Sequence, residues 1–385
     1  MNIAFTLIAS KTWMGGFNYL LNLLTGLSRF ESERVHPFIF CGGDASDSDV
    51  AAFEGIAGVT VIRSPVFNAE NRRRALIRAL LTGVDRATMN CFDQHRIDVV
   101  FESAIFYGWR FPLPAVAWFP DLQHRQMPEL FPRAAWWRRE IGFRLQIASG
   151  RRILLSSETA RQDCEQFYPD TTSRTEVLRF PARIAESDLQ SDPYELLAAF
   201  ALPQAFAFLP NQFYKHKNHA VVIDALGILR KKGRSVTVVT TGNPKDPRHP
   251  GFYEELEQRM KTLGVTHDFR LLGMVSRPHL LALLRTCSVL INPSLFEGWS
   301  STVEEGKALG IPMVLSDLPV HREQAGNQAK YFETDDAEKL ADFLEIYAVI
   351  TPLNPRNLQV DQDALLADFA SRFAKVAIQQ NERHP

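Results

Sequence analysis

Short apolar runs alternate with helical patterns along the whole chain. The runs of the first half predict buried strands at residues 2–9, 36–41, 58–63, 97–101, 115–119 and 153–155. A second series begins at Ala205, and it predicts strands at 205–209, 235–241, 269–276, 289–291 and 313–315. Leucines at helical spacing follow the first strand from Tyr19 to Leu27, and further helices are expected at 71–91, 220–230, 277–286, 335–349 and 365–379. Strands that alternate with helices are typical of parallel sheets, so the predicted fold class is α/β.

The chain is long enough for two domains of ordinary size, at 385 residues. Residues 181–204 are more polar than the segments on either side and contain prolines, which indicates a linker. We therefore predict an N-terminal domain over 1–182, a linker over 183–204, a second domain over 205–364 and a C-terminal helix over 365–385.

Composition and charge exclude several classes of protein. The apolar fraction of 45% and the charged fraction of 23% are those of a soluble globular protein, and a net charge of −1 provides no basic field for nucleic acid. Four cysteines without CxxC spacing argue against a zinc site and indicate a reducing compartment. No apolar run approaches the ~18 residues of a membrane span, and the first residues lack a basic segment. We expect a cytoplasmic protein.

Residues 287–326 contain the most informative pattern. A short strand ends at Asn292, a loop follows, and Ser301 with Glu304 three residues later forms a capping-box pattern, so the N-cap is predicted at Ser301. Backbone N–H groups at a helix start have no partners within the helix and favour an anion such as a diphosphate. Glu297 in the loop and Glu305 inside the helix flank this start. Carboxylates accept hydrogen bonds from sugar hydroxyls, so the stretch suits a nucleoside diphosphate sugar, with ribose on Glu305 and hexose on Glu297.

Glu297 and Glu305, with seven residues between them, resemble the Glu-x7-Glu signature of retaining glycosyltransferases of family 4. The flanking residues 293–294, 308–312 and 316–317 resemble that family too. The alternative is an ordinary αβ unit with a capping acid and a solvated acid, and Glu304 is assigned to that explanation.

The resemblance implies the GT-B fold, with two Rossmann-like α/β domains facing across a cleft and a last helix crossing back to the N-terminal domain. It also implies metal-independent transfer of a hexose from a nucleoside diphosphate sugar to a hydroxyl of a glycan or lipid-linked acceptor, as in cell-surface polysaccharide or lipopolysaccharide synthesis. No nucleophile is evident opposite Glu297, so attack on the same face of the sugar is expected. Asp47-Ser48-Asp49 has the spacing of a metal motif but lies in a small-residue linker, where a solvated turn is expected.

Three further segments resemble the same family. Gly15-Gly16 follows the first strand, where a glycine pair lets backbone approach the donor phosphates closely; the alternative is a plain tight turn. His124 follows the strand at 115–119, and the resemblance gives it a place facing the donor sugar; the alternative is a surface histidine. Lys217 matches a lysine that offsets charge on the leaving diphosphate. The arginine expected five residues earlier is replaced by Gln212, and Lys215 is one candidate for the missing charge.

These assignments define the predicted site. The catalytic residues are Glu297, His124 and Lys217, and no metal ligands are predicted. The predicted donor-binding residues are Gly15, Gly16, Gln212, Lys217, Gly273, Met274, Val275, Gly298, Trp299, Ser300, Ser301, Thr302 and Glu305.

Other functions stay open at this point. A sugar-nucleotide 2-epimerase shares the GT-B fold, and a non-catalytic subunit that binds nucleotide sugars would carry the same motifs. Arg72-Arg73-Arg74 and the leucines after them form one of two basic helical segments in the N-terminal domain. Such a segment either contacts an anionic membrane surface, with a lipid-linked acceptor, or packs its leucines into the core.

Overall fold

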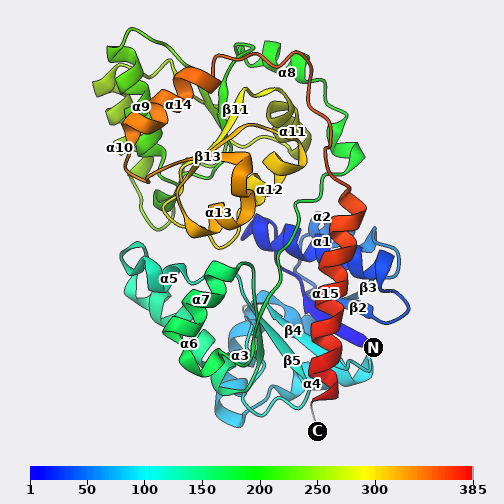
Figure 1. Cartoon of the computed structure of the whole chain (residues 1–385). Helices are drawn as coiled ribbons and strands as arrows, with labels where there is room; N and C mark the ends of the chain where they lie inside the picture. The colour runs from blue at the N-terminus through cyan, green and yellow to red at the C-terminus, as the bar shows by residue number, and fades with distance from the viewer. Residues whose placement is uncertain (104, 384–385) are drawn as a thin grey trace. The chain divides into compact units, whose positions relative to one another are not determined.

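The computed structural model describes residues 1–103 and 105–383, and the chain forms two compact units. The first unit comprises Met1–Pro128, Arg133–Pro181 and the segment that begins at Gln362. The second comprises Glu129–Pro132 and Ala182–Asp361. Each unit contains one parallel sheet covered by helices on both faces (Figure 1).

The sheet of the first unit has seven strands in the order β3-β2-β1-β4-β5-β6-β7. All neighbouring strands pair in parallel, with Ile3 of the central strand opposite Pro37 on one side and Val99 on the other. The strands are β1 Asn2–Thr6, β2 His36–Cys41, β3 Thr60–Arg63, β4 Val99–Ser103, β5 Ala115–Phe119, β6 Arg152–Leu155 and β7 Thr175–Val177. The α-helices are α1 Met14–Phe30, α2 Asp47–Glu54, α3 Ala69–Thr82, α4 Arg86–Gln94, α5 Gln123–Gln126, α6 Arg133–Ala148, α7 Glu158–Phe167 and α15 Gln362–Glu382. Short 3₁₀ turns lie at η1 Pro65–Phe67, η2 Pro128–Leu130 and η3 Pro169–Thr171.

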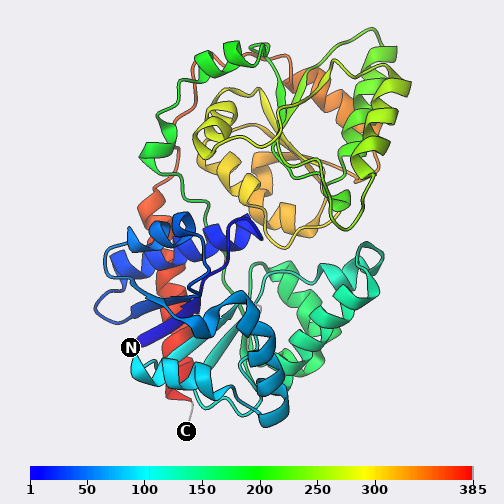
Figure 2. The ribbon, with the colours of Figure 1, turned by 180° about the vertical axis from the view of Figure 1, so that it is seen from behind.

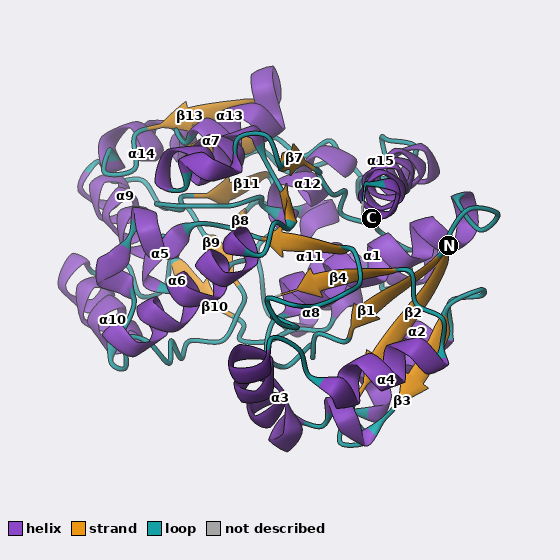
Figure 3. Ribbon diagram, turned by 90° about the horizontal axis from the view of Figure 1, so that it is seen from below, coloured by secondary structure: helices purple, strands orange, loops and turns teal. Residues whose placement is uncertain are grey.

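Alternation along the strands divides the core of this unit between the two faces of the sheet (Figure 3). Ile3 and Phe5 pack with α1 and α15, whereas Ala4 between them packs with α4. Helix α15, although last in the chain, lies along α1 in both side views (Figures 1 and 2). Gly26 of α1 permits this close approach, because a Cβ there would lie 3.0 Å from the backbone oxygen of Leu366.

The sheet of the second unit has six parallel strands in the order β10-β9-β8-β11-β12-β13. The strands are β8 Ala207–Leu209, β9 Val238–Thr240, β10 Phe269–Leu271, β11 Val289–Asn292, β12 Met313–Ser316 and β13 Ala329–Phe332. The α-helices are α8 Pro193–Ala199, α9 His219–Lys231, α10 Phe252–Leu263, α11 Arg277–Thr286, α12 Ser301–Ala308, α13 Pro319–Ala325 and α14 Ala337–Tyr347. The 3₁₀ turns are η4 Glu186–Leu189, η5 Lys215–Lys217 and η6 Gly326–Gln328.

Both sheets have the strand order of a Rossmann fold, in which the chain reverses direction across the sheet beside its first strand. In the second unit this switch point lies between β8 and β11, which are hydrogen-bonded neighbours. Loops after the carboxyl ends of strands at a switch point are the usual ligand-binding position in open α/β sheets. The predicted α/β class and the two Rossmann-like sheets are therefore confirmed.

Several local predictions were wrong. Residues 71–91 form two helices, because Gly83 adopts a left-handed conformation that ends α3, and Asp85 caps α4 by accepting a hydrogen bond from Thr88 N. Asp49 is not in a solvated turn: it is buried in α2 and accepts hydrogen bonds from the backbone and hydroxyl of Ser10. Residues 183–204, expected as linker, contain η4 and α8, which pack on α11.

Candidate functional site

Two asparagines join the central strands of the second unit at the switch point. Asn211 lies just after β8 and Asn292 ends β11, and both are buried. The Asn211 side-chain amide donates to Asn292 Oδ1 over 3.3 Å, and the Asn292 amide donates to Ser300 Oγ over 2.9 Å. The Ser294 hydroxyl lies 2.8 Å from Asn292 Oδ1. Asn292 therefore fixes both ends of the loop between β11 and α12.

Glu297 lies in that loop and forms an ion pair with Lys217 of η5, with Nζ and Oε1 2.6 Å apart. Its side chain is only 9% exposed, and the same Oε1 lies 2.8 Å from the Ser294 hydroxyl. Burial disfavours the carboxylate, but the nearby charge of Lys217 holds the pKa of Glu297 at about 2. The carboxylate is thus an anion at neutral pH, placed to accept hydrogen bonds.

Asn218 holds η5 against this loop. It has a left-handed backbone with φ of 55°, and its side-chain amide donates to the carbonyls of Pro293 at 3.1 Å and Thr334 at 2.7 Å. Leu295 N also donates to His216 O over 2.8 Å. These contacts position Lys217 beside Glu297.

Helix α12 begins one residue earlier than predicted. Ser300, not Ser301, is the N-cap, and its hydroxyl accepts from Val303 N. Gln324 of α13 replaces the predicted capping box: its amide group exchanges two 3.0 Å hydrogen bonds with the Ser300 backbone and donates to Glu304. Glu304 also pairs with Lys307, in agreement with its structural assignment.

Glu305 lies one turn inside α12 and is buried. It forms a short hydrogen-bonded ion pair with Arg277, the first residue of α11. Ser276 caps α11 directly after Gly273, Met274 and Val275, which are among the predicted donor-binding residues. The side-chain oxygen of Gln212 accepts from Asn243 N over 2.8 Å, and its amide lies 3.7 Å from Met274 Sδ. Gln212 therefore joins the loops after β8 and β9 to that segment.

The structure thus brings the predicted residues of the second unit together in two contacts, Lys217 with Glu297 and Gln212 with Met274. Gly298, Trp299 and Thr302 lie between Glu297 and Glu305 in the β11–α12 loop and the first turn of α12. Sequence reasoning missed Asn292, Arg277, His321 and Gln324. Their contacts join segments that are distant in sequence, so local patterns do not indicate them. Only Asn292 could have been identified from the sequence, because it is a polar residue at the end of an apolar run.

Gly15 and Gly16 lie in the first turn of α1 rather than in a free loop. The indole of Trp13, the N-cap residue, packs against both: a Cβ on Gly16 would lie 2.7 Å from a ring carbon of Trp13. Trp13 itself stacks on Trp118 with ring centroids 5.1 Å apart. In this structure the glycine pair makes room for a tryptophan of its own chain.

His124 lies on α5 with 0% exposure, so it is not the surface histidine of the alternative explanation. Its Nε2 lies 3.2 Å from Glu140 Oε2, and that buried carboxylate also pairs with Arg125 and Arg144 and accepts from Tyr168. Burial, reinforced by Arg139, lowers the pKa of His124 to about 4 although Glu140 favours the charged form. The imidazole is therefore neutral at pH 7 and anchored inside the first unit.

Comparison with solved structures identifies the fold. The chain superposes on a glycosyltransferase from Rickettsia africae ESF-5 with a TM-score of 0.63 and 14% identity, covering 98% of this chain and 93% of that one. Anabaena HepE in complex with UDP-glucose gives a TM-score of 0.63 at 15% identity over 100% and 98% of the two chains. WaaG, a glycosyltransferase involved in lipopolysaccharide biosynthesis, gives 0.60 at 14% identity over 100% and 98%. The fold is that of the GT-B glycosyltransferases.

The family comparison then places the second unit. Residues 199–347 match the model for glycosyl transferases group 1, so the chain contains a domain of that family. The putative glycosyltransferase EpsF of Bacillus subtilis (strain 168) is 26% identical over 194 residues. The chain spans about half the length of this curated relative, since the alignment covers 48% of each protein.

Proposed function

We propose that this protein is a retaining glycosyltransferase of the family 4 type that transfers a hexose from a nucleoside diphosphate sugar without a metal ion. The observation that carries the proposal is the partly buried Lys217–Glu297 pair at the switch point of a glycosyl transferases group 1 domain, beside the N-terminus of α12. A cation, a carboxylate and free helix N–H groups are what a sugar diphosphate requires. The structural likeness to HepE bound to UDP and UDP-glucose makes a uridine diphosphate hexose the first donor to test.

Lys217 is proposed to act on the leaving group. In the reaction, the acceptor oxygen bonds to the anomeric carbon while the bond from that carbon to the diphosphate oxygen breaks. The electron pair leaves with the diphosphate, and the acceptor proton passes to the departing phosphate oxygen on the same face of the sugar. The ammonium of Lys217 and the N–H groups at the start of α12 offset the growing negative charge.

Glu297 and Glu305 are proposed to orient the donor. Glu297 has a second carboxylate oxygen beyond the one that Lys217 and Ser294 share, and this oxygen is suited to a hexose hydroxyl. Glu305 is proposed to accept from the ribose while Arg277 holds it in place. Arg277 also brings a guanidinium beside Glu305, which makes it a better candidate than the exposed Lys215 for the positive charge missing at Gln212.

We propose that His124 supports the site structurally, because its imidazole is buried against Glu140. The family resemblance implies that this ring faces the donor sugar. The role of His124 at the sugar therefore stays a prediction.

The exposed side chains of helix α3 support the proposal of a lipid-linked acceptor at an anionic membrane surface. Its leucine stripe is not part of the core: Ala79 is its single buried residue, while Leu81 is 78% and Ile77 47% exposed. The exposed Arg72, Arg73 and Arg74 precede these residues on the same helix. Apolar side chains beside a basic cluster fit an interfacial helix. Among the described residues, no helix has the length and apolar character needed to cross a bilayer.

The proposal is tested by calorimetry without metal, in which UDP, GDP and ADP and their glucose or mannose forms are titrated into the wild-type protein and into Glu305→Ala. We expect one nucleotide to bind and Glu305→Ala to weaken it by about 1–3 kcal/mol, the usual value for lost hydrogen bonds to a charged group. NMR of the product formed from that donor should show the anomeric configuration of the donor.

Two results would contradict the proposal. If folded protein binds none of these compounds, α12 is only a well-capped helix and the donor site is absent. If the donor binds but is converted to an epimer without any acceptor, the protein is a sugar-nucleotide 2-epimerase and not a transferase.

A further inference from the structure

His321 is a buried histidine beside the Lys217–Glu297 pair that the proposed reaction does not use. It lies on α13, which follows β12, and its side chain is 0% exposed. Its Nδ1 lies 2.8 Å from the carbonyl oxygen of Ser316 and 3.2 Å from the Ser316 hydroxyl. The carbonyl can only accept, so Nδ1 carries the hydrogen and the neutral ring has its lone pair on Nε2.

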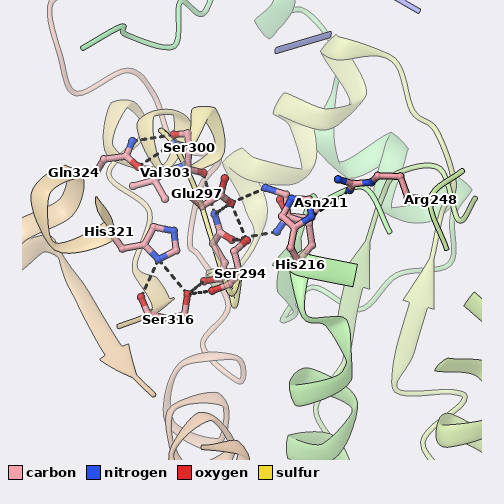
Figure 4. Close-up of polar contacts among 12 residues, drawn as sticks. Asn211, His216, Arg248, Ser294, Glu297, Ser300, Val303, Ser316, His321 and Gln324 are labelled. Atoms are coloured by element: carbon pink, nitrogen blue, oxygen red, sulfur yellow. Dashed lines mark hydrogen bonds and ion pairs between the residues drawn. The ribbon is translucent and has the colours of Figure 1, made fainter. Parts of the chain in front are cut away.

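The Nε2 atom is buried and has no hydrogen-bond partner among the residues that the structure describes. An unsatisfied buried polar atom is costly and rare, so its presence calls for an explanation, of which a functional role is one. Figure 4 shows the ring beside the cluster that contains Glu297, Ser294 and Ser316. Because Nδ1 is already protonated, Nε2 is the atom at which the ring would take up a proton.

Four charged groups and one phenol surround this histidine. Burial is the largest influence and lowers its pKa, Glu297 and Asp317 raise it, and Lys217 lowers it. Asp317 is itself paired with Arg322 of α13, with Nε and Oδ1 2.5 Å apart. The hydroxyl of Tyr331 on β13 donates to the His321 carbonyl over 3.4 Å. Glu297 and Lys217 therefore act on the ring in opposite directions.

We propose that His321 is a positioning residue that takes up a proton when a sugar diphosphate draws Lys217 away from Glu297. The inference rests on the proposed function. In the free protein, Lys217 neutralises Glu297. When the diphosphate engages Lys217, two phosphate charges enter and the Glu297 carboxylate loses its counterion. An imidazolium at His321 then replaces that counterion and keeps the carboxylate fixed for the hexose.

The direction of the pH dependence follows from these charges. The bound state has a higher affinity for the proton than the free state, so the donor binds more tightly as the pH falls from about 8 to about 6. We expect the dissociation constant to fall by about three- to tenfold over that range.

The test uses UDP-glucose, because its diphosphate has no group that titrates near neutral pH. Calorimetry at about pH 6.5 in two buffers of different ionisation enthalpy gives the number of protons taken up on binding, and about half a proton or more is expected. His321→Asn keeps an amide donor for the Ser316 carbonyl but cannot be protonated, so uptake should vanish and the pH dependence should flatten. The same substitution at the exposed His267, in the turn before β10, is the matched control and should leave both unchanged.

The outcomes separate this inference from the proposed function. Binding of UDP-glucose with no proton uptake, or with uptake that His321→Asn retains, overturns the inference and leaves the transferase proposal standing. A second measurement needs no donor: the imidazole signal of His321, assigned by its loss in His321→Asn, is titrated by NMR in the wild type and in Lys217→Met. Removal of the cation should raise the pKa of His321, and an unchanged or lowered pKa overturns the inference.

Discussion

Lys217 and Glu297 lie 80 residues apart in sequence and meet at 2.6 Å at the carboxyl edge of the second sheet. Each was predicted to contact a different part of the donor, the diphosphate and the hexose. In the structure each is the other's counterion. In the proposed function, binding of the donor replaces an ion pair within the protein with protein–ligand contacts, which links substrate binding to the electrostatics of the free site.

Replacement of Lys217 tests its role in the reaction. Lys217→Met should lower the rate of hexose transfer by about 10²–10³, because one preorganised contact to the leaving group is lost. The rate is measured with the donor that calorimetry identifies. Lys261→Met, at an exposed position of α10, is the control. Wild-type turnover by Lys217→Met would remove the lysine from the mechanism.

The ion pair also predicts how stability depends on pH. The pKa of Glu297 is about 2 in the folded protein against an ordinary value of 4.5, so the pair stabilises the fold above about pH 4.5. This stabilisation, of the order of 3 kcal/mol, is lost as the pH falls towards 2. Urea unfolding of wild type and Glu297→Gln should therefore converge in acid. Parallel curves at every pH would contradict the assignment.

Two substitutions at Asn218 separate the contribution of its backbone conformation to stability from that of its hydrogen bonds. Asn218→Ala should destabilise the protein by about 2–4 kcal/mol, since it loses two hydrogen bonds and strains a left-handed residue. Asn218→Gly loses the same bonds but tolerates the conformation, so it should cost about 1 kcal/mol less. Both are measured by urea unfolding, and equal losses would show that the left-handed backbone contributes nothing.

His124 predicts a second dependence of stability on pH, at higher pH values than that of Glu297. Its pKa is lowered to about 4 mainly by burial, so the fold resists its protonation. Stability should fall by up to about 3 kcal/mol as the pH drops from about 6.5 to 4. His124→Gln should show a flatter profile over this window, whereas His267→Gln should follow the wild type. A His124→Gln profile as steep as the wild type would place the titration elsewhere.

The exposed stripe of α3 predicts binding to anionic vesicles. Wild-type protein should float with phosphatidylglycerol vesicles, and Ile77→Glu with Leu81→Glu should abolish flotation by placing two anions on the contact surface. Ile346→Glu, at a residue 58% exposed on α14, is the control. Wild-type protein that stays at the bottom of the gradient would exclude α3 as a membrane contact.

Local sequence signals predicted the sheets well. Apolar runs such as 289–291 and 313–315 are strands because both faces of a parallel sheet are covered by helices, which leaves a near-continuous run of buried residues. The start of α12 was one residue off because two adjacent serines both fit the N-cap. The choice between them was made by Gln324, which binds the Ser300 backbone from another helix.

The contacts inside the candidate site could not be predicted in the same way. Glu297 and Glu305 were found from their spacing, but their partners Lys217 and Arg277 lie on different elements. His124 was expected at a ligand and lies buried against Glu140, because sequence shows that a histidine follows a strand but not which way the ring turns. Burial and pairing are tertiary properties, so residue type and spacing identify candidates and leave their partners open.

The position of helix α15 at the end of the sequence has a consequence for folding during translation. Its Phe369 and Phe373 close the core over Tyr19 and Phe5, yet they are made after the entire second unit. At about 5–20 residues per second, the 180 positions between Pro181 and Gln362 take about 10–40 s to translate. During that interval the aromatic surface of the nascent first unit lacks its cover from α15. The core of the first unit is therefore completed only after the second unit has been synthesised.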